Sequence, residues 1–452
     1  MFEETETPAI TPGSSFLDRS RSLSGMVILS THVVRAAFAL LAILLLPVSA
    51  LAREPVILVS IDGFRADYLA RGATPVLDGL AASGVRARGL RPSFPSLTFP
   101  NHYTLVTGLR PDRHGMVDNV MRDDRRPGVT YSMSNRSETN DRFWWDDGEP
   151  VWVTAEKAGL RTATLFWPGS ESDIRGVRPG TWLTFDKSMP AEARVNQLLE
   201  WMSRPAGRRP DFATLYFDDV DTAGHQQGPD AEATLRAIRR VDTAIGALIE
   251  GLGRLGIQGN VIVVSDHGMR ATSPDRVIEL ESVVPAGSFD LVTQGSAAGF
   301  SALPGREAEV RKALSRSHPN VDCWPRERIP ARLHYGAHPR VPPFVCLARP
   351  GWLVLTRATL ARRPVQAGGA HGYDPMDPEM AGLFVANGPA FRAGVILPAF
   401  DNIHVHPLLL DLLGLASPEV DGRRSVTRRA LAPHAVADSP AMRQGRGEAR
   451  AQ

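Results

Sequence analysis

Carboxylate and imidazole side chains gather just after the three most apolar short stretches of this chain. Each stretch is continuous and rich in β-branched residues, which is typical of strands buried on both faces of a parallel sheet. Because parallel strands end on one edge of a sheet, where α/β proteins place their sites, we expect the following side chains to lie together. They are Asp62 after residues 55–61, Asp221 and His225 after 212–217, Asp266 and His267 after 261–265, and His371 in a glycine-rich segment.

These six side chains predict a pair of metal ions. Three carboxylates in one place would repel one another and raise each other's pKa, and bound cations remove that conflict. Mixed histidine and aspartate ligands favour Zn²⁺ over Mg²⁺ or Ca²⁺, which prefer oxygen alone. We therefore expect two Zn²⁺, held by two sets of three ligands. Ions about 4 Å apart can stabilise both the attacking and the leaving oxygen of a phosphoryl transfer.

Thr98 is the candidate nucleophile beside these metals. It lies in the segment R-P-S-F-P-S-L-T-F-P-N-H-Y, where Pro95 and Pro100 stiffen the chain before a helix expected to begin near Asn101. The N-terminal end of a helix favours an anionic group, but a threonine hydroxyl needs a base or a metal to activate it. A threonine in this position could also simply cap the helix, so the assignment depends on the metal pair.

Strands and helices alternate along most of the chain. The clearest helix covers residues 230–252, where apolar residues recur at helical spacing. Further helices are expected at 74–83, 149–158, 191–203 and 403–413, and further strands at 162–167 and 382–386. This alternation predicts an α/β fold with a doubly wound, mostly parallel sheet flanked by helices.

The N-terminal residues 1–52 have the layout of a secretory signal peptide. Arg35 precedes a short apolar run at 36–48, and Ala50-Leu51-Ala52 gives a small-residue cleavage pattern. The run is short for a membrane span, so we expect cleavage after Ala52 and a periplasmic or secreted protein. Retention as an anchor, and a start at Met26, stay open.

The remaining chain is expected to form one catalytic domain at 53–420. Residues 285–365 are rich in proline and arginine and are expected to be an insertion or cap. This region contains the only two cysteines, Cys323 and Cys346, and an exported protein would join them in a disulfide. Residues 421–452 carry seven arginines against three acids and predict a disordered tail. The net charge of +2 gives no indication of a nucleic-acid-binding surface.

Several motifs together resemble the nucleotide pyrophosphatase/phosphodiesterase family of the alkaline phosphatase superfamily. They follow the family's order over most of residues 55–415 and include the candidate residues above. The motifs are V-S-I-D-G-F-R at 59–65, T-F-P-N-H-Y at 98–103, G-M-V-D-N at 115–119, W-P-G-S at 167–170, D-T-A-G-H at 221–225, S-D-H-G-M at 265–269 and H-G-Y-D at 371–374. The resemblance implies an alkaline-phosphatase-like fold with a smaller inserted cap region.

The resemblance also implies a role for each site residue. One zinc would be held by Asp62, Thr98, Asp266 and His267, and the other by Asp221, His225 and His371. Asn119 would bind a phosphate oxygen, and Phe99 and Tyr216 would flank the base. The family often has a second tyrosine after W-P-G-S, and we place Trp182 at that position. His102 and His114 match family positions that have no ligand role.

The implied activity is hydrolysis of nucleotide phosphodiester or pyrophosphate bonds through a covalent threonine intermediate, which releases nucleoside 5′-monophosphates. A phosphodiesterase for lipid or choline-type headgroups, or a phosphomonoesterase of the same superfamily, would share the metal core. No arginine directly flanks Thr98, which favours a diester substrate, although Arg91 is near in sequence. A zinc-stabilised binding protein without catalysis is the alternative from another class. The sequence does not indicate the oligomeric state.

Overall fold

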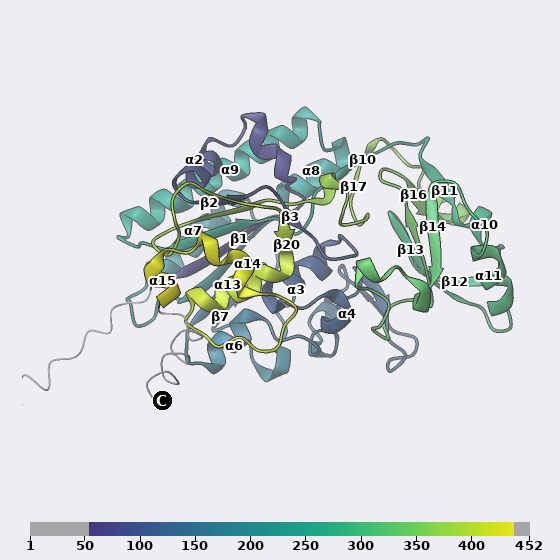
Figure 1. The fold of residues 1–452 in the computed structure, drawn as a ribbon, viewed down its shortest axis with the longest axis horizontal. Helices are drawn as coiled ribbons and strands as arrows, with labels where there is room; N and C mark the ends of the chain where they lie inside the picture. Colours follow the sequence, from purple (N-terminus) through teal and green to yellow (C-terminus); the bar gives the residue numbers. More distant parts are fainter. Residues whose placement is uncertain (1–53, 438–452) are drawn as a thin grey trace, which may run out of the picture. The chain divides into compact units, whose positions relative to one another are not determined.

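The computed structural model describes residues 54–437, and the predicted signal peptide at 1–52 lies outside the described residues. An eight-stranded sheet runs through the described chain in the order β19-β2-β18-β9-β1-β8-β6-β7 (Figure 1). Its strands are β1 (Val56–Ile61), β2 (Val85–Ala87), β6 (Thr162–Leu165), β7 (Thr181–Leu183), β8 (Phe212–Phe217), β9 (Asn260–Val264), β18 (Phe384–Asn387) and β19 (Val395–Leu397).

The sheet is mostly parallel, as predicted. The central strand β1 pairs in parallel with β8 on one side and with β9 on the other. Parallel pairing continues from β8 to β6 and from β6 to β7. Strand β18 runs against both of its neighbours, β9 and β2. The ends of β1, β8 and β9 therefore meet at one edge.

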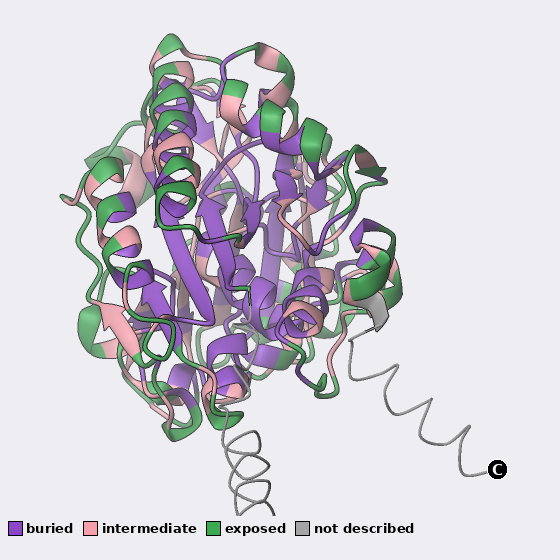
Figure 2. Cartoon of the chain, turned by 90° about the vertical axis from the view of Figure 1, so that its left-hand side faces the viewer, coloured by how far each residue is buried: buried purple, intermediate pink, exposed green. Residues whose placement is uncertain are grey.

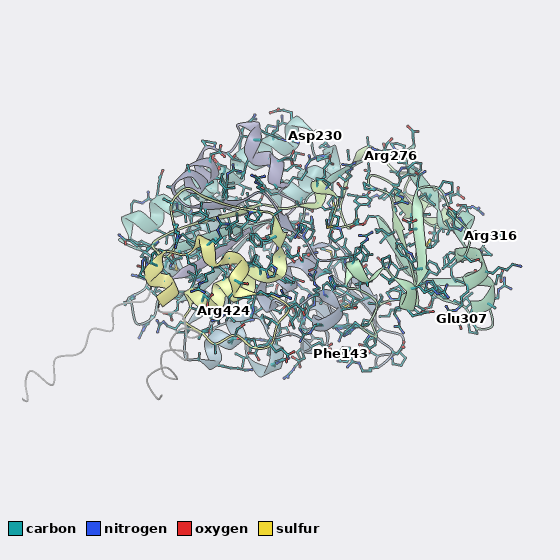
Figure 3. All side chains as sticks on the ribbon, in the orientation of Figure 1. Phe143, Asp230, Arg276, Glu307, Arg316 and Arg424 are labelled. Atoms are coloured by element: carbon teal, nitrogen blue, oxygen red, sulfur yellow. A yellow bond between two sulfur atoms is a disulfide. The ribbon has the colours of Figure 1, made fainter. Side chains whose placement is uncertain are left out.

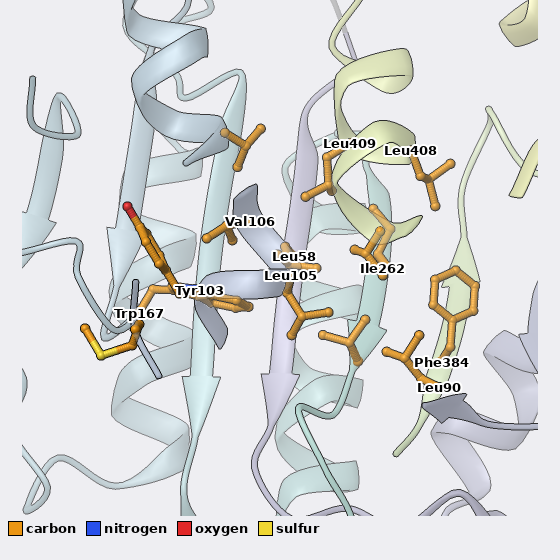
Figure 4. Close-up of a cluster of buried hydrophobic side chains, with 14 of the residues drawn as sticks. Leu58, Leu90, Tyr103, Leu105, Val106, Trp167, Ile262, Phe384, Leu408 and Leu409 are labelled. Atoms are coloured by element: carbon orange, nitrogen blue, oxygen red, sulfur yellow. The ribbon is translucent and has the colours of Figure 1, made fainter. Parts of the chain in front are cut away.

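Helices cover both faces of this sheet. Helices α2 (Pro75–Ser83), α7 (Ala191–Met202) and α9 (Glu232–Arg254) pack on one face, and α3 (Thr98–Thr107), α6 (Val151–Lys157) and α13 (Val405–Leu412) pack on the other. The residues of β1 alternate between these two layers, so the strand is buried throughout, as its continuous apolar sequence predicts. Figure 2 shows the buried strands between helices whose outer surfaces are exposed. Figure 4 shows Leu105 and Val106 of α3 against Leu58 of β1.

A smaller antiparallel sheet lies within the predicted insertion. Its order is β12-β13-β15-β14, formed by Phe289–Thr293, Ala297–Ala302, Phe344–Ala348 and Val321–Pro325 respectively. The helix α11 (Glu307–Leu314) packs against it, and Figure 3 labels Glu307 at the start of this helix and Arg316 just beyond it. Cys323 and Cys346 face each other on β14 and β15 and form a disulfide. We keep the cap boundaries of 285–365 as a proposal.

Short elements connect the main ones and join the two sheets. Arg122 on β4 (Val120–Arg122) forms an ion pair with Asp290 on β12 at 2.5 Å. The other short strands are β3 (Leu90–Arg91), β5 (Thr130–Ser132), β10 (Arg270–Thr272), β11 (Val277–Glu279), β16 (Leu353–Leu355), β17 (Gly368–Ala370) and β20 (Phe400–Asp401). The other α-helices are α4 (Pro111–His114), α5 (Arg136–Thr139), α8 (Asp219–Gln227), α10 (Leu280–Val283), α12 (Arg357–Arg362), α14 (Arg424–Thr427) and α15 (Pro433–Ala437).

Two parts of the fold differ from the sequence-based expectation. Helix α3 begins at Thr98 itself rather than near Asn101, because Pro100 falls in the first turn, where a missing N–H costs nothing. Residues 424–437, expected to belong to a disordered tail, form short helices instead. Ala430 and Leu431 are buried, and Leu431 bridges to Phe391. Two apolar residues therefore anchor an otherwise arginine-rich segment, while residues 438–452 lie outside the described chain.

Candidate metal centre and nucleophile

The ends of the three central strands bring the predicted carboxylates together. Asp62 directly follows β1, Asp266 follows β9 after one residue, and Asp221 lies in the first turn of α8, just beyond β8. All three are buried or half-buried, so their charges are poorly solvated. Close strand pairing thus places three acids from distant parts of the sequence at one edge of the sheet.

His267 lies at the centre of one group of ligands. Its Nε2 atom is 3.0 Å from Asp266 Oδ2 and 3.4 Å from Asp62 Oδ1. The Thr98 hydroxyl lies 3.2 Å from the same nitrogen. Helix α3 therefore presents its first residue to the group, and all four predicted members of this set are in contact.

His225, His371 and Asp221 form the second group. His225 Nε2 lies 3.4 Å from Asp221 Oδ1, and His371 Nε2 lies 3.7 Å from the same oxygen. The His371 ring also stacks on the His267 ring, with centroids 3.6 Å apart. The two groups are therefore adjacent.

Backbone carbonyls fix the orientation of the three imidazoles. The Nδ1 atoms contact the carbonyl oxygens of Gly369 for His225, Ser96 for His371 and Gly268 for His267, at 2.8, 2.9 and 2.9 Å respectively. A carbonyl only accepts, so each Nδ1 carries a proton, and in the neutral form of each ring Nε2 carries a lone pair. This arrangement is the usual one for metal-ligating histidines.

Burial and mutual repulsion perturb the titration of these groups. Burial, and then the charges of Asp266 and Asp221, raise the pKa of Asp62 well above its usual value. Burial also raises the pKa of Asp221. Burial alone would raise the pKa of Asp266 too, but His267 and His102 outweigh it, so this pKa lies well below its usual value. Burial and the neighbouring histidines lower the pKa of His371.

The donor set fits metal ions. Asp62 Oδ1, Asp221 Oδ1 and Asp266 Oδ2 are buried and have no hydrogen-bond donor among the described residues. Leaving buried carboxylate oxygens unpaired is costly, and cations bound between them and the Nε2 lone pairs would satisfy both. Asp221, His267 and His371 form one set within 4.8 Å, and Asp62, His102 and Asp266 form another. The predicted division into two ligand sets stays a prediction.

His102 contacts both the backbone of the candidate nucleophile and a candidate ligand, and its lack of a ligand role stays a prediction. Its Nδ1 atom contacts the Thr98 carbonyl at 2.9 Å and Asp266 Oδ2 at 3.2 Å. Its Nε2 atom contacts the Ser60 hydroxyl at 2.8 Å. Both ring nitrogens are therefore occupied. His114, also buried, bonds to Thr104 and contacts none of the candidate ligands.

Asn119 lies beside the nucleophile. Its Oδ1 atom accepts a hydrogen bond of 3.0 Å from the backbone N–H of Phe99, the residue after Thr98. This bond turns the amide so that Nδ2 is the remaining donor. The predicted role of Asn119 as a donor to a phosphate oxygen stays a prediction.

A cavity of about 840 Å³ opens next to Thr98 and Asp62. Phe99 lies on one part of its wall and packs on Trp145, with centroids 6.0 Å apart. Tyr216 also lines it, and its hydroxyl donates to Asp62 Oδ2 at 2.6 Å. This bond means that Tyr216 orients a ligand carboxylate as well as lining the cavity.

Trp182 is not among the residues that line this cavity in the described chain. It lies on β7, half-buried, with Arg178 over its ring at 5.4 Å. Phe185, three residues later, lines the cavity instead. Sequence reasoning missed Phe185 because it follows the strand in an irregular segment, and only its aromatic character could have suggested it.

Comparisons with known proteins show similarity over most of the described chain. The model of the family "Type I phosphodiesterase / nucleotide pyrophosphatase" matches residues 56–374. Ectonucleotide pyrophosphatase/phosphodiesterase family member 1 of Mus musculus is 36% identical over 374 residues, which are 80% of this chain and 41% of that protein. The chain thus spans less than half the length of that relative. Bis(5′-adenosyl)-triphosphatase enpp4 of Xenopus laevis is 34% identical, over 83% of this chain and 81% of that protein.

Among solved structures, an inactive variant of murine ectonucleotide pyrophosphatase/phosphodiesterase 5 in complex with AMP superposes with a TM-score of 0.79. It is 33% identical in sequence, and the match covers 84% of this chain and all of that chain. Across residues 54–437, no helix combines the length and the apolar character that crossing a bilayer requires. The extent of the family match and of the full-length structural match shows that this chain belongs to the type I phosphodiesterase/nucleotide pyrophosphatase family.

Proposed function

We propose that this protein is a two-zinc phosphodiesterase that hydrolyses nucleotide phosphodiester or pyrophosphate bonds and releases nucleoside 5′-monophosphates. The observation that carries the proposal is the contact of the Thr98 hydroxyl with His267 Nε2, which itself touches Asp62 and Asp266. A hydroxyl in the middle of such a donor set is placed to become a nucleophile. Family members that carry nucleotide names or bind AMP support the substrate class.

Asp62, Asp266, His267 and Thr98 would hold one ion, and Asp221, His225 and His371 the other. Bound Zn²⁺ would favour ionisation of the hydroxyl and stabilise negative charge on the oxygens around phosphorus. Backbone carbonyls orient the three histidines so that each Nε2 faces the proposed ions. Such nitrogen ligands suit Zn²⁺ better than they suit ions that prefer oxygen ligands alone.

The residues of the chain then direct a two-step displacement. Thr98 Oγ1 attacks phosphorus, its proton is lost to solvent, and the bond to the leaving oxygen breaks opposite the new bond. Asn119 Nδ2 donates to a phosphate oxygen and holds it as charge shifts. Water then attacks the threonyl phosphodiester from the vacated side, releasing the nucleoside monophosphate and restoring the threonine hydroxyl.

The cavity beside Thr98 would hold the nucleoside. Phe99 and Tyr216 are the predicted aromatic contacts, and Phe166, Trp167 and Phe185 add further aromatic surface to the same cavity. Stacking on such rings tolerates different bases. Trp182 could contribute only from outside this cavity wall, so we assign the second stacking surface to Phe185.

The arginine nearest to Thr98 in sequence gives no reason to expect a monoester substrate, although Arg136 and Lys187 line the cavity beside the nucleophile. The nearest arginine in sequence, Arg91, bonds to Asp401 at 2.8 Å and is thereby engaged away from the nucleophile. A monoesterase needs additional positive charge for the second phosphate charge.

Export to the periplasm or outside the cell remains part of the proposal, since residues 1–52 are not described.

A three-substrate comparison tests the function. We expect p-nitrophenyl thymidine 5′-monophosphate to be hydrolysed with a kcat/KM at least about tenfold above that for p-nitrophenyl phosphate or p-nitrophenyl phosphorylcholine. A preference for the choline ester would establish the headgroup phosphodiesterase instead. Stoichiometric metal without turnover of any of the three would indicate a binding protein.

A further inference from the structure

The Phe185 side chain forms an exposed part of the cavity wall without support from the sheet. Strand β7 ends at Leu183, so the backbone at 184–188 has no ladder of strand hydrogen bonds. The residue is 37% exposed, and its ring meets Phe166 edge-on, with centroids 5.4 Å apart. Tyr216 lies further away, at 6.1 Å. A ring placed this way could easily turn out of the cavity if its backbone moved.

Two charged side chains hold the backbone of Phe185 from opposite ends. The N–H of Phe185 donates to Glu171 Oε1 at 2.8 Å. The carbonyl of Phe185 accepts from an Arg136 guanidinium nitrogen at 2.6 Å. Glu171 follows the turn at Trp167–Ser170, whereas Arg136 begins helix α5. Three segments far apart in sequence therefore meet at one residue.

Neither charged group makes a second hydrogen bond among the described residues, although the charge of Arg136 also interacts with Asp186. The bond to Phe185 is the one hydrogen bond made by each of these two side chains among the described residues, and neither forms an ion pair there. Both side chains also line the cavity. Hydrogen bonds with one charged partner are about twice as strong as neutral ones, so they suit the task of fixing an otherwise free loop.

We infer that Arg136 and Glu171 are positioning residues that hold Phe185 in place to receive the base of the substrate. We refer to Arg136, Phe185 and Glu171 as the Phe185 clamp. The inference rests on the proposed function for its substrate class, and it assigns specificity to two residues outside the metal centre. A wall fixed in advance lowers the ordering cost of binding, so the clamp contributes to affinity for the nucleoside rather than to the chemical step.

Two diesters with the same leaving group separate these effects. The nucleoside of p-nitrophenyl thymidine 5′-monophosphate would reach the clamp, whereas the methyl group of methyl p-nitrophenyl phosphate would not. We expect Arg136→Ala and Glu171→Ala each to raise KM for the thymidine ester about three- to tenfold with kcat little changed. Both constants for the methyl ester should stay at the wild-type values.

A conservative variant and two control variants distinguish loss of the hydrogen bond to Phe185 from a general effect of substituting a charged residue. Glu171→Gln keeps a carbonyl oxygen that can accept from the Phe185 N–H, so it should restore most of the lost affinity. The exposed Glu192 and Arg208 lie outside the cavity lining, and Glu192→Ala and Arg208→Ala serve as matched controls with wild-type kinetics. A Glu171→Gln variant as impaired as Glu171→Ala would contradict the role of this hydrogen bond.

A double-mutant cycle with Phe185→Ala tests whether the two residues act through the ring. Once the ring is absent, Arg136→Ala or Glu171→Ala should raise KM no further. A further increase would show that the charged groups contact the nucleoside directly and would overturn the inference. Equal losses on both esters, or no loss on either, would also overturn it.

Calorimetry with thymidine 5′-monophosphate gives the same comparison without turnover. Each alanine variant should bind this nucleotide about three- to tenfold more weakly than the wild type. Unchanged binding contradicts the clamp even if the protein hydrolyses neither ester. In contrast, an inactive protein that shows the expected binding losses would contradict only the proposed hydrolysis.

Discussion

The Nε2 atoms of His225 and His371 lie 3.1 Å apart, and in the neutral rings neither nitrogen has a proton to share with the other. Each ring donates its Nδ1–H to a backbone carbonyl, of Gly369 and of Ser96 respectively. Two lone pairs therefore face each other beside the Asp221 carboxylate. This contact would be repulsive in a centre without a cation, and it becomes favourable when both nitrogens bind the same ion.

Removal of metal should abolish activity. We expect dialysis against a chelator to remove about two Zn²⁺ per chain, measured by mass spectrometry, and to lower turnover of p-nitrophenyl thymidine 5′-monophosphate to background. Zn²⁺ should restore turnover better than Mg²⁺ or Ca²⁺, because three imidazoles belong to the donor set. His371→Ala should lower the zinc content, whereas His318→Ala in the cap should not. Full activity in the metal-free protein would rule out the two-zinc mechanism.

Thr98→Ala should remove catalysis without removing the metals. The substitution deletes the attacking oxygen but leaves three aspartates and three histidines in place, so zinc content should stay at the wild-type value. We expect kcat to fall on the order of 10⁴-fold or more. Thr98→Ser keeps the hydroxyl and should retain measurable turnover. If the alanine variant kept wild-type turnover, another group would be the nucleophile.

Those site residues could be predicted from the sequence that directly follow an apolar strand, because the pairing of parallel strands then brings them together. Asp62 and Asp266 each follow an apolar run that is typical of a buried strand, and parallel pairing of β1 with β9 places their ends together. His371 lies in a glycine-rich segment without a periodic pattern, so only its residue type made it a candidate ligand. Phe185 could not be found in this way, because two side chains distant in sequence hold its backbone.

The C-terminal boundary of the folded chain shows a second limit of predictions made from amino-acid composition. Seven arginines in residues 421–452 predict a solvated chain. However, Ala430 and Leu431 are buried, and the Ala430 carbonyl accepts from the Arg392 N–H at 2.9 Å. A few tertiary contacts therefore outweigh the average character of the segment, and a sequence window cannot register them.

Arg340 should make a large contribution to the stability of the fold. Its side chain is fully buried, pairs with Asp123 at 2.8 Å and donates to the carbonyls of Gly115, Phe143 and Trp144. Arg340→Ala would leave three buried carbonyls without this donor and would remove one of the two arginines that pair with Asp123, the other being Arg125. We expect the free energy of unfolding, measured by urea denaturation, to fall by about 3 kcal/mol.

The exposed pair of Arg349 and Asp322 provides the matched control for this prediction. Its nitrogen–oxygen distance is 3.1 Å, but both side chains are solvated. Arg349→Ala should therefore cost less than about 1 kcal/mol. Similar losses for the two alanine variants would show that burial of the Arg340 network adds nothing to stability.

Asp118 should make stability depend on pH near neutrality. Burial raises the pKa of this carboxyl to about 7, and the hydrogen bonds that it accepts come from the neutral donors Val120 N–H and the Thr293 hydroxyl. The unfolded chain has a pKa of about 4 for this group. The folded state therefore binds the proton more tightly, and the free energy of unfolding should fall as pH rises from about 4 to about 7.

Asp118→Asn removes this titration while keeping an oxygen that can accept both hydrogen bonds. Relative to the wild type, the variant should gain up to a few kcal/mol of stability between about pH 4 and pH 8, with the gain complete once the pH exceeds the folded pKa. Urea denaturation at a series of pH values measures this difference, and Asp275→Asn at an exposed position supplies the control. If the difference between variant and wild type stayed constant across this range, the Asp118 carboxyl would not be protonated in the folded protein at neutral pH.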